Sequence, residues 1–118
     1  MTRAGGVAAE DYRESGTVPV GASVRVMRGF YEGLEVPVDL DWMVIGRGRS
    51  ADVVLAEPTI SRAHVAIGHD GGGFFMQDLG STNGTRVNGE RATRVPLTDG
   101  DELQLGKLRL RVSLPVES

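Results

Sequence analysis

This sequence predicts an all-β fold, an antiparallel β-sandwich, and three observations lead to that prediction. From Ser23 to Val112, short apolar segments follow one another at the 8–12-residue spacing of a sandwich or barrel. Turn residues separate these segments, and the 17 glycines of the chain are about twice the usual share. No stretch after Ser23 has the periodicity of an amphipathic helix. About ten short strands are therefore expected.

The first predicted strands are recognised by their apolar pattern. Residues 24–27 and 34–38 alternate in polarity across a turn at 29–33, which is typical of strands with one buried face. Residues 42–45 form a continuous apolar run, which indicates a strand covered on both faces, and Pro58 ends the segment that includes the next strand. The full set of predicted strands is 24–27, 34–38, 42–45, 53–55, 64–67, 74–77, 85–87, 90–92, 103–105 and 108–112.

The later strands are recognised by the turns between them. The glycine-rich segment 69–73 connects the first predicted hairpin, and Gly106-Lys107 connects the last. Asn88-Gly89 lies between the other two and is the strongest short hairpin signal in sequences, because both residues tolerate a positive φ. The chain from residue 64 onward is therefore expected to form three hairpins.

Composition limits the possible classes of function. The formal net charge of −3 argues against a general nucleic-acid binder, and no apolar run is long enough to span a membrane. Because the chain has no cysteine and only two histidines, we expect no metal site and no cofactor. We expect a cytoplasmic monomer with a flexible tail over residues 1–21, a short helix near 8–13 in that tail, one domain over 22–113 and a C-terminal tail over 114–118.

The residues that carry chemistry lie in the predicted loops. Three polar stretches, 46–50, 61–64 and 80–85, together with Asn88, each adjoin the end of a predicted strand. If they meet at one end of the sandwich, arginine, hydroxyl and amide groups would converge there, with backbone N–H groups made accessible by glycines. Such a set is rich in donors and poor in acceptors, which suits a phosphate dianion. It offers no nucleophile–base pair for hydrolysis, so we expect no enzyme.

The same stretches resemble the forkhead-associated (FHA) domain pattern, in order and in spacing. The matching residues are Gly46-Arg47, Ser61-x-x-His64 and Ser81-Thr82-Asn83-Gly84-Thr85-x-x-Asn88-Gly89. The resemblance implies a sandwich of about eleven strands whose loops at one end bind phosphothreonine peptides. It also implies partners in signalling, namely a phosphorylated Ser/Thr kinase, its substrate or a scaffold.

The resemblance implies a role for each motif residue. Arg47 would contact the phosphate, Ser61 would donate its hydroxyl to it, and Arg62 would add a phosphate or peptide contact. Thr82 would close the pocket, and Asn83 would bond the peptide backbone. The residues expected to support the binding loops are Gly46, His64, Gly84 and Asn88. Peptide preference would depend on the loop at 56–60 and on a loop around Gly100 or Gly106.

The sequence also permits three other interpretations. Gly46-x-Gly48-x-x-Ala51 has the spelling of a dinucleotide-binding loop, but a strand rather than a helix is predicted to follow it. Phosphorylated Thr17 in the tail would be a ligand for the chain's own pocket, although the acidic Thr-Thr motif of similar self-regulated proteins is absent. A phosphate-independent interaction or oligomerisation domain is the third alternative.

Overall fold

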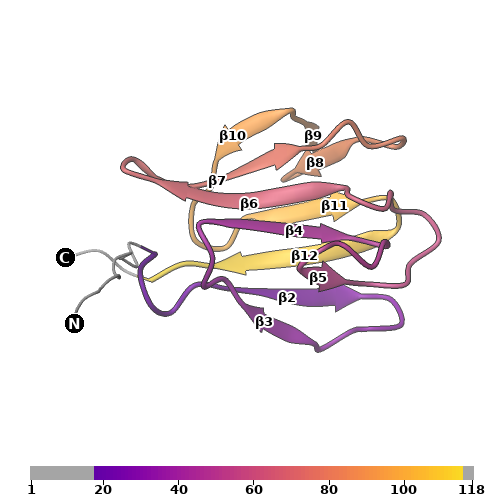
Figure 1. Ribbon diagram of the computed structural model, residues 1–118, viewed down its shortest axis with the longest axis horizontal. Helices are drawn as coiled ribbons and strands as arrows, with labels where there is room; N and C mark the ends of the chain where they lie inside the picture. The colour runs from indigo at the N-terminus through magenta and orange to yellow at the C-terminus, as the bar shows by residue number, and fades with distance from the viewer. Residues whose placement is uncertain (1–17, 116–118) are drawn as a thin grey trace.

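Two β-sheets face each other in the computed structural model, which describes residues 18–115 (Figure 1). The five-stranded sheet has the order β10-β7-β6-β4-β5, and the six-stranded sheet has the order β3-β2-β12-β11-β8-β9. The strands are β2 (Ser23–Arg28), β3 (Glu35–Pro37), β4 (Trp42–Gly46), β5 (Val53–Val54), β6 (Val65–Asp70), β7 (Gly73–Asp78), β8 (Thr85–Val87), β9 (Glu90–Arg91), β10 (Arg94–Pro96), β11 (Glu102–Leu105) and β12 (Leu108–Ser113). The predicted all-β sandwich is confirmed.

Alternation of side chains builds the core between the sheets. In β12, Leu108, Leu110 and Val112 are buried, whereas Arg109 and Arg111 between them are exposed. The neighbouring strands β11 and β2 bury alternate residues in the same way, and each fully buried aliphatic side chain stabilises the fold by roughly 1.5–3 kcal/mol. The pairing of β11 with β12 across Gly106-Lys107 is the hairpin that the sequence predicts.

In β6, four successive residues, Val65 to Gly68, are buried, so burial does not alternate along this strand. Gly68 faces outward, where the ring of Phe75 from β7 covers it, so that a Cβ on Gly68 would lie 2.3 Å from the Phe75 Cζ. The Phe75 ring also lies beneath the guanidinium of Arg94, 3.8 Å from its Cζ. The outer face of the strand is therefore shielded by its neighbours, which explains why the sequence of β6 does not alternate.

One strand pair departs from the predicted antiparallel pattern. β4 and β5 pair in parallel, with Ile45 opposite Val53. Parallel neighbours usually need a long crossover, but here the loop between them turns back along β4. Asp52 fixes this return, because its N–H donates to the Val44 carbonyl (2.9 Å) and its carboxylate accepts the Val44 N–H (2.8 Å). Because a single loop residue holds this strand pair together, the apolar periodicity of the sequence does not predict the parallel pairing.

The strand β10 was not among the strands predicted from the residue pattern. It has three residues, Arg94, Val95 and Pro96, and lies at the edge of its sheet beside β7. Proline has no N–H to donate and is tolerated in sheets at such edges. The segment therefore lacks both the length and the composition by which a strand is recognised.

The ends of the described chain adjoin the domain without a break. Val18 and Leu114, which the sequence analysis placed in tails, pack partly buried against the core. The helix expected near 8–13, Thr17 and residues 116–118 lie outside the described residues. Within residues 18–115, no helix is long and apolar enough to cross a membrane.

Candidate functional site

The three polar stretches meet at one end of the sandwich. The loops after β4, before β6 and before β8 lie at the right-hand end in Figure 1, together with the turn between β11 and β12. The opposite end carries the β6–β7 turn and the two ends of the described chain (Figure 1). Each loop begins or ends on a strand of the core, so the fold itself brings the stretches together.

Close backbone contact joins the first two loops. The N–H of Arg47 donates to the Ser61 carbonyl (3.0 Å), and the N–H of Gly48 donates to the Arg62 carbonyl (3.0 Å). Gly46 makes this approach possible, because a Cβ at this position would lie 2.0 Å from the Arg62 carbonyl oxygen. The glycine is thus required for the contact between two backbone segments.

The Arg47 side chain is held by the same loop. Its Nε donates to the carbonyl of Ile60 at 3.0 Å, which fixes the plane of the guanidinium. The side chain remains exposed, and the four ion pairs found within residues 18–115 do not include Arg47. A planar, oriented guanidinium is therefore presented to solvent beside Ser61, where it can bind an anion through two nitrogens.

The Ser61 hydroxyl is positioned by the third loop. Its oxygen accepts the backbone N–H of Thr82 at 3.0 Å. A hydroxyl has one proton to donate and two lone pairs to accept with, so this contact leaves the proton available. The half-buried Ser61 side chain thus offers a donor directly between the Arg47 loop and the Thr82 loop.

His64 connects the second and third loops from inside the molecule. Its side chain is fully buried, its Nδ1 accepts the N–H of Ser61 (3.0 Å), and its Nε2 lies 2.9 Å from the carbonyl oxygen of Gly84. Because a backbone N–H can only donate, Nδ1 carries no proton and Nε2 donates to Gly84. The imidazole therefore bonds backbone groups, and the geometry does not make it a base for the Ser61 hydroxyl.

Asp78 organises the third loop, although it was not among the predicted site residues. Its carboxylate accepts the N–H groups of Gly80 and Ser81 (both 3.0 Å) and the hydroxyls of Ser81 (2.6 Å) and Thr85 (2.7 Å). Burial raises the pKa of Asp78, but these four hydrogen bonds outweigh burial and leave the pKa below its usual value. An aspartate two residues before Gly80-Ser81 is a turn signal that could have identified it.

Thr59 connects the loop before β6 to two further loops. Its carbonyl accepts the amide Nδ2 of Asn83 (2.9 Å), and its hydroxyl accepts the backbone N–H of Lys107 (2.8 Å) and donates to Glu57 (2.7 Å). The side-chain and backbone hydrogen bonds from Thr59 lower the pKa of Glu57, and Lys107 adds to the effect. Of the two loops considered for peptide preference, the one at Gly106 lies here, where a Cβ on Gly106 would lie 2.4 Å from the Thr59 carbonyl oxygen.

The structure brings most of the predicted site residues together, but not all. Arg62 and Thr82 are exposed on the converging loops, and Asn83 lies beside Thr59. Asn88, in contrast, follows β8 at the strand's other end, adopts a φ of 51° and bonds Asp101 (2.9 Å). It fixes the β10–β11 connection rather than the binding loops, and Gly100 lies in that same distant connection.

Three backbone N–H groups that were expected to face a ligand, those of Arg47, Gly48 and Gly84, instead donate within the protein. The N–H groups of Arg47 and Gly48 donate to the loop before β6, and the N–H of Gly84 donates to the Ser81 hydroxyl (2.9 Å). These groups are therefore already used within the protein. Side-chain donors at this end include those of Arg47, Ser61 and Arg62, of which Arg47 and Arg62 are exposed and Ser61 is half-buried.

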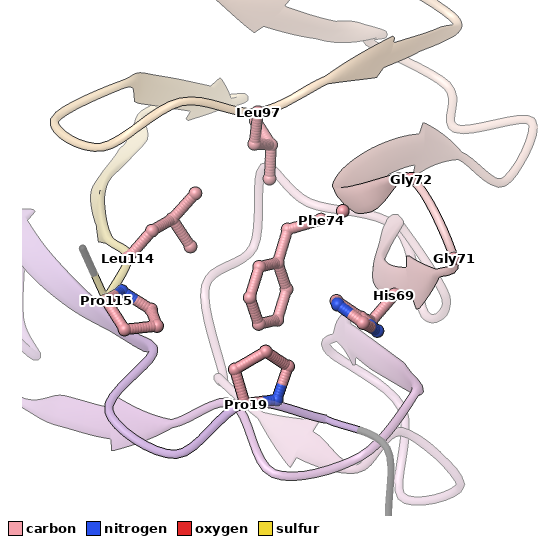
Figure 2. Close-up of a pocket in the computed structure, with 9 residues that line it drawn as sticks. Pro19, His69, Gly71, Gly72, Phe74, Leu97, Leu114 and Pro115 are labelled. Carbon is pink, nitrogen blue, oxygen red and sulfur yellow. The ribbon is translucent and has the colours of Figure 1, made fainter. Parts of the chain in front are cut away.

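Two pockets lie at opposite ends of the molecule. One of about 380 Å³ is at the end with the β6–β7 turn, where Figure 2 shows Phe74, Leu97 and Leu114 pointing into it. Glycine and proline residues complete its lining together with His69, and it contains none of the predicted site residues. The other, of about 310 Å³, lies beside the converging loops and is lined by Asn83 and Gly84 among others. Its lining includes Thr59, Asn83 and Lys107, whose side chains can donate hydrogen bonds to an anionic ligand.

Comparison with known proteins agrees with the geometry. The family model described as the FHA domain matches residues 43–106. A curated relative, the oxoglutarate dehydrogenase inhibitor of Corynebacterium diphtheriae, is 39% identical over 95 residues, which are 80% of this chain and 66% of that protein. The glycogen accumulation regulator GarA of Mycolicibacterium smegmatis is 38% identical over 94 residues, which are 79% of this chain and 60% of that protein. The chain thus spans 66% or less of the length of these two relatives.

Solved structures give the same result. A structure from a study of phosphothreonine-dependent FHA domain interactions superposes with a TM-score of 0.74 at 31% identity, covering 81% of this chain and 98% of that one. The FhaA FHA domain, solved in complex with the intracellular domain of Rv3910, has a TM-score of 0.71 at 33% identity and covers 78% of this chain and 99% of that one. The fold, the converging loops and these matches show that the chain belongs to the FHA domain family.

Proposed function

We propose that this chain is a non-catalytic module that binds phosphothreonine peptides through the loop end of the sandwich. It recruits a phosphorylated protein in Ser/Thr kinase signalling, which is a kinase, its substrate or a scaffold. It acts as a cytoplasmic monomer and needs no cofactor or metal. The observation that carries the proposal is the convergence of the oriented Arg47 guanidinium with the Ser61 hydroxyl at one exposed point.

Each site residue has a role that follows from its position. Arg47 and Arg62 neutralise the phosphate, which carries about −1.5 to −2 charges near neutral pH, and Ser61 donates a hydrogen bond to it. Thr82, whose N–H bonds the Ser61 oxygen, closes the pocket. The Asn83 amide already bonds the Thr59 carbonyl through Nδ2, so its Oδ1 is the atom available to accept a peptide N–H.

A titration with three matched peptides tests the proposal. The peptides differ only in carrying phosphothreonine, phosphoserine or unmodified threonine, and fluorescence anisotropy measures their Kd. We expect the phosphothreonine peptide to bind most tightly, near the micromolar range, which corresponds to about −8 kcal/mol. Equal affinity for all three peptides would disprove the proposal.

A variant pair assigns the effect to Arg47. Arg47→Ala should weaken phosphothreonine binding by at least about 30-fold, since truncating one partner of a close charge pair costs about 2 kcal/mol or more. Arg25→Ala is the matched control, because Arg25 is exposed on β2 and pairs with Glu35 at 3.3 Å. The control should bind like the wild type, and a similar loss in both variants would exclude a specific role for Arg47.

A further inference from the structure

A row of arginines crosses the outer face of the six-stranded sheet. Cross-strand pairing places Arg91 opposite Arg86, Arg86 opposite Gln104, Gln104 opposite Arg109, and Arg109 opposite Arg28. Residues paired in this way project from the same face of a sheet, and the four arginines are exposed. We call these five residues the arginine row. Five strands about 4.8 Å apart make the row roughly 19 Å long.

The arginine row contains no acidic residue, unlike the row beside it. The neighbouring row is balanced in charge, with Glu35 and Glu102 at its ends and Arg25 opposite Arg111 between them. Its ion pairs are Arg25–Glu35 (3.3 Å) and Arg111–Glu102 (3.4 Å). Glu102 also approaches Arg109 at 3.9 Å, so one carboxylate is shared between two arginines. The neighbouring row is thus neutral, whereas the arginine row carries about four positive charges.

Like charges oppose one another directly within the arginine row. Arg86 faces Arg91, and Arg109 faces Arg28, an arrangement that destabilises a sheet. The strand pair β2–β12 has a register shift at Arg109, so that Arg28 rather than Met27 lies opposite it. An anion bound along the row would relieve this repulsion. The protein as a whole has a net charge of −3, so the positive field is a local property of this face.

The arginine row is continuous with the candidate phosphothreonine site. Arg86 and Gln104 line the 310 Å³ pocket together with Asn83 and Lys107. The Arg91 guanidinium covers Gly84, since a Cβ on that glycine would lie 2.8 Å from the Arg91 Cζ. A chain that places a phosphothreonine beside Arg47 and Ser61 can therefore continue across Asn83 onto the row.

We propose that the arginine row binds acidic side chains of the partner polypeptide that flank its phosphothreonine. The inference rests on the proposed function and names the class of partner, a phosphothreonine followed or preceded by a run of aspartate or glutamate. An extended segment rises about 3.3 Å per residue, so about six residues would span the row. Guanidinium groups form strong hydrogen bonds with carboxylates. A single exposed ion pair contributes little to binding, but several adjacent pairs contribute as a network.

Three phosphothreonine peptides of equal length test the inference. One has neutral flanks, one has six aspartates before the phosphothreonine, and one has six after it. We expect one of the two acidic peptides to bind the wild-type chain about 10-fold more tightly than the neutral peptide at 50 mM salt. At 500 mM salt the advantage should fall to about 2-fold, because the Debye length shortens to a few ångströms.

Two double variants locate the effect. Arg28→Gln with Arg109→Gln should reduce the acidic advantage to about 2-fold or less at low salt, while the neutral phosphopeptide binds as it does to the wild type. The control, Arg25→Gln with Arg94→Gln, removes the same charge from the neighbouring row and from β10. The control should keep the full advantage. Unchanged binding of the neutral peptide shows that each variant is folded.

The outcomes separate this inference from the proposed function. Phosphate-dependent binding with no advantage for either acidic peptide overturns the inference alone, as does an advantage that survives in Arg28→Gln/Arg109→Gln. Binding of a 20-base-pair DNA duplex more tightly than the acidic phosphopeptides would make the row a nucleic-acid surface and also overturn it. Binding that does not depend on phosphate in any peptide overturns the proposed function and this inference with it.

Discussion

His64 shows at the residue scale how one buried side chain holds two binding loops. The ring satisfies the Ser61 N–H and the Gly84 carbonyl at once, and both would be left without a partner in His64→Ala. An unsatisfied buried group costs about 1–3 kcal/mol, so the variant should lose about 2–4 kcal/mol of unfolding free energy, measured by urea denaturation. His69→Ala, which removes an edge contact with Phe74, should lose about 1 kcal/mol or less. Equal losses of unfolding free energy in the two variants would show that the hydrogen bonds of His64 stabilise the fold no more than the His69 contact does.

Gly46 provides a second test at this scale. Gly46→Ala places a methyl group on the Arg62 carbonyl, and both atoms belong to backbone that no rotamer can move aside. We expect a loss of about 3 kcal/mol or more, together with loss of phosphopeptide binding. Gly71→Ala is the control, because a Cβ there meets nothing within 4 Å. The control should stay within about 0.5 kcal/mol of the wild type in thermal and urea unfolding. A tolerated Gly46→Ala would contradict the close approach.

The sequence could predict which residues gather at the site, but only part of what they do. Residue type and spacing identified Arg47 and Ser61, because an exposed donor in a loop keeps its chemistry wherever the loop lies. Whether a backbone N–H group is available to a ligand depends on which carbonyl of another loop lies close enough to accept it. The local sequence does not contain that information. For the same reason Asn88 was grouped with the binding loops, although its side chain bonds Asp101 at the far end of β8.

At the scale of elements, the loop before β8 depends on the ionised form of Asp78. Its pKa is lowered in the folded state, so its hydrogen bonds stabilise fully above about pH 4, and this contribution is lost as pH falls through the folded pKa. Asp78→Asn should cost about 1–3 kcal/mol at pH 7, where the charged acceptor is replaced. Between pH 6 and pH 3 the wild type should lose more unfolding free energy than the variant.

The comparison with Asp78→Asn isolates one carboxylate. Asp101, Glu57 and Glu35 also have lowered pKa values, and they destabilise both proteins alike in acid. The difference between the two pH profiles therefore reports Asp78. Parallel profiles from pH 6 to pH 3, in urea unfolding followed by tryptophan fluorescence, would rule out its ionised form as the support of this loop.

Hairpins were the most predictable elements, whereas the edge strand β10 and the parallel pairing of β5 were the least predictable. Asn88-Gly89 and Gly106-Lys107 determine their own pairings, because the turn and both strands lie within about a dozen residues. The strands β10 and β5 have three and two residues and take their structure from the strand beside them. The parallel pairing of β5 depends on Asp52 bonding back to Val44, which is a tertiary contact rather than a propensity.

At the scale of the whole molecule, the binding loops and the chain's entry point lie at opposite ends. The chain enters beside Val18, which packs against the core, and β2 then runs toward the loop end (Figure 1). The 6 residues of β2 alone span roughly 20 Å. Even with residues 18–21 released, the five-residue segment from Thr17 to Ala22 reaches at most about 18 Å. We therefore expect that phosphorylated Thr17 does not reach Arg47 of its own domain.

This distance predicts the behaviour of a chain phosphorylated at Thr17. At low micromolar concentration its Kd for a phosphothreonine peptide should equal that of the unmodified chain, because no tethered ligand competes. At concentrations of hundreds of micromolar, phosphorylated Thr17 can reach Arg47 of a second copy, so light scattering should detect association that Arg47→Ala abolishes. A loss of peptide affinity that does not depend on protein concentration would contradict this prediction. It would mean that phosphorylated Thr17 fills the pocket of its own chain and that part of β2 detaches to allow this.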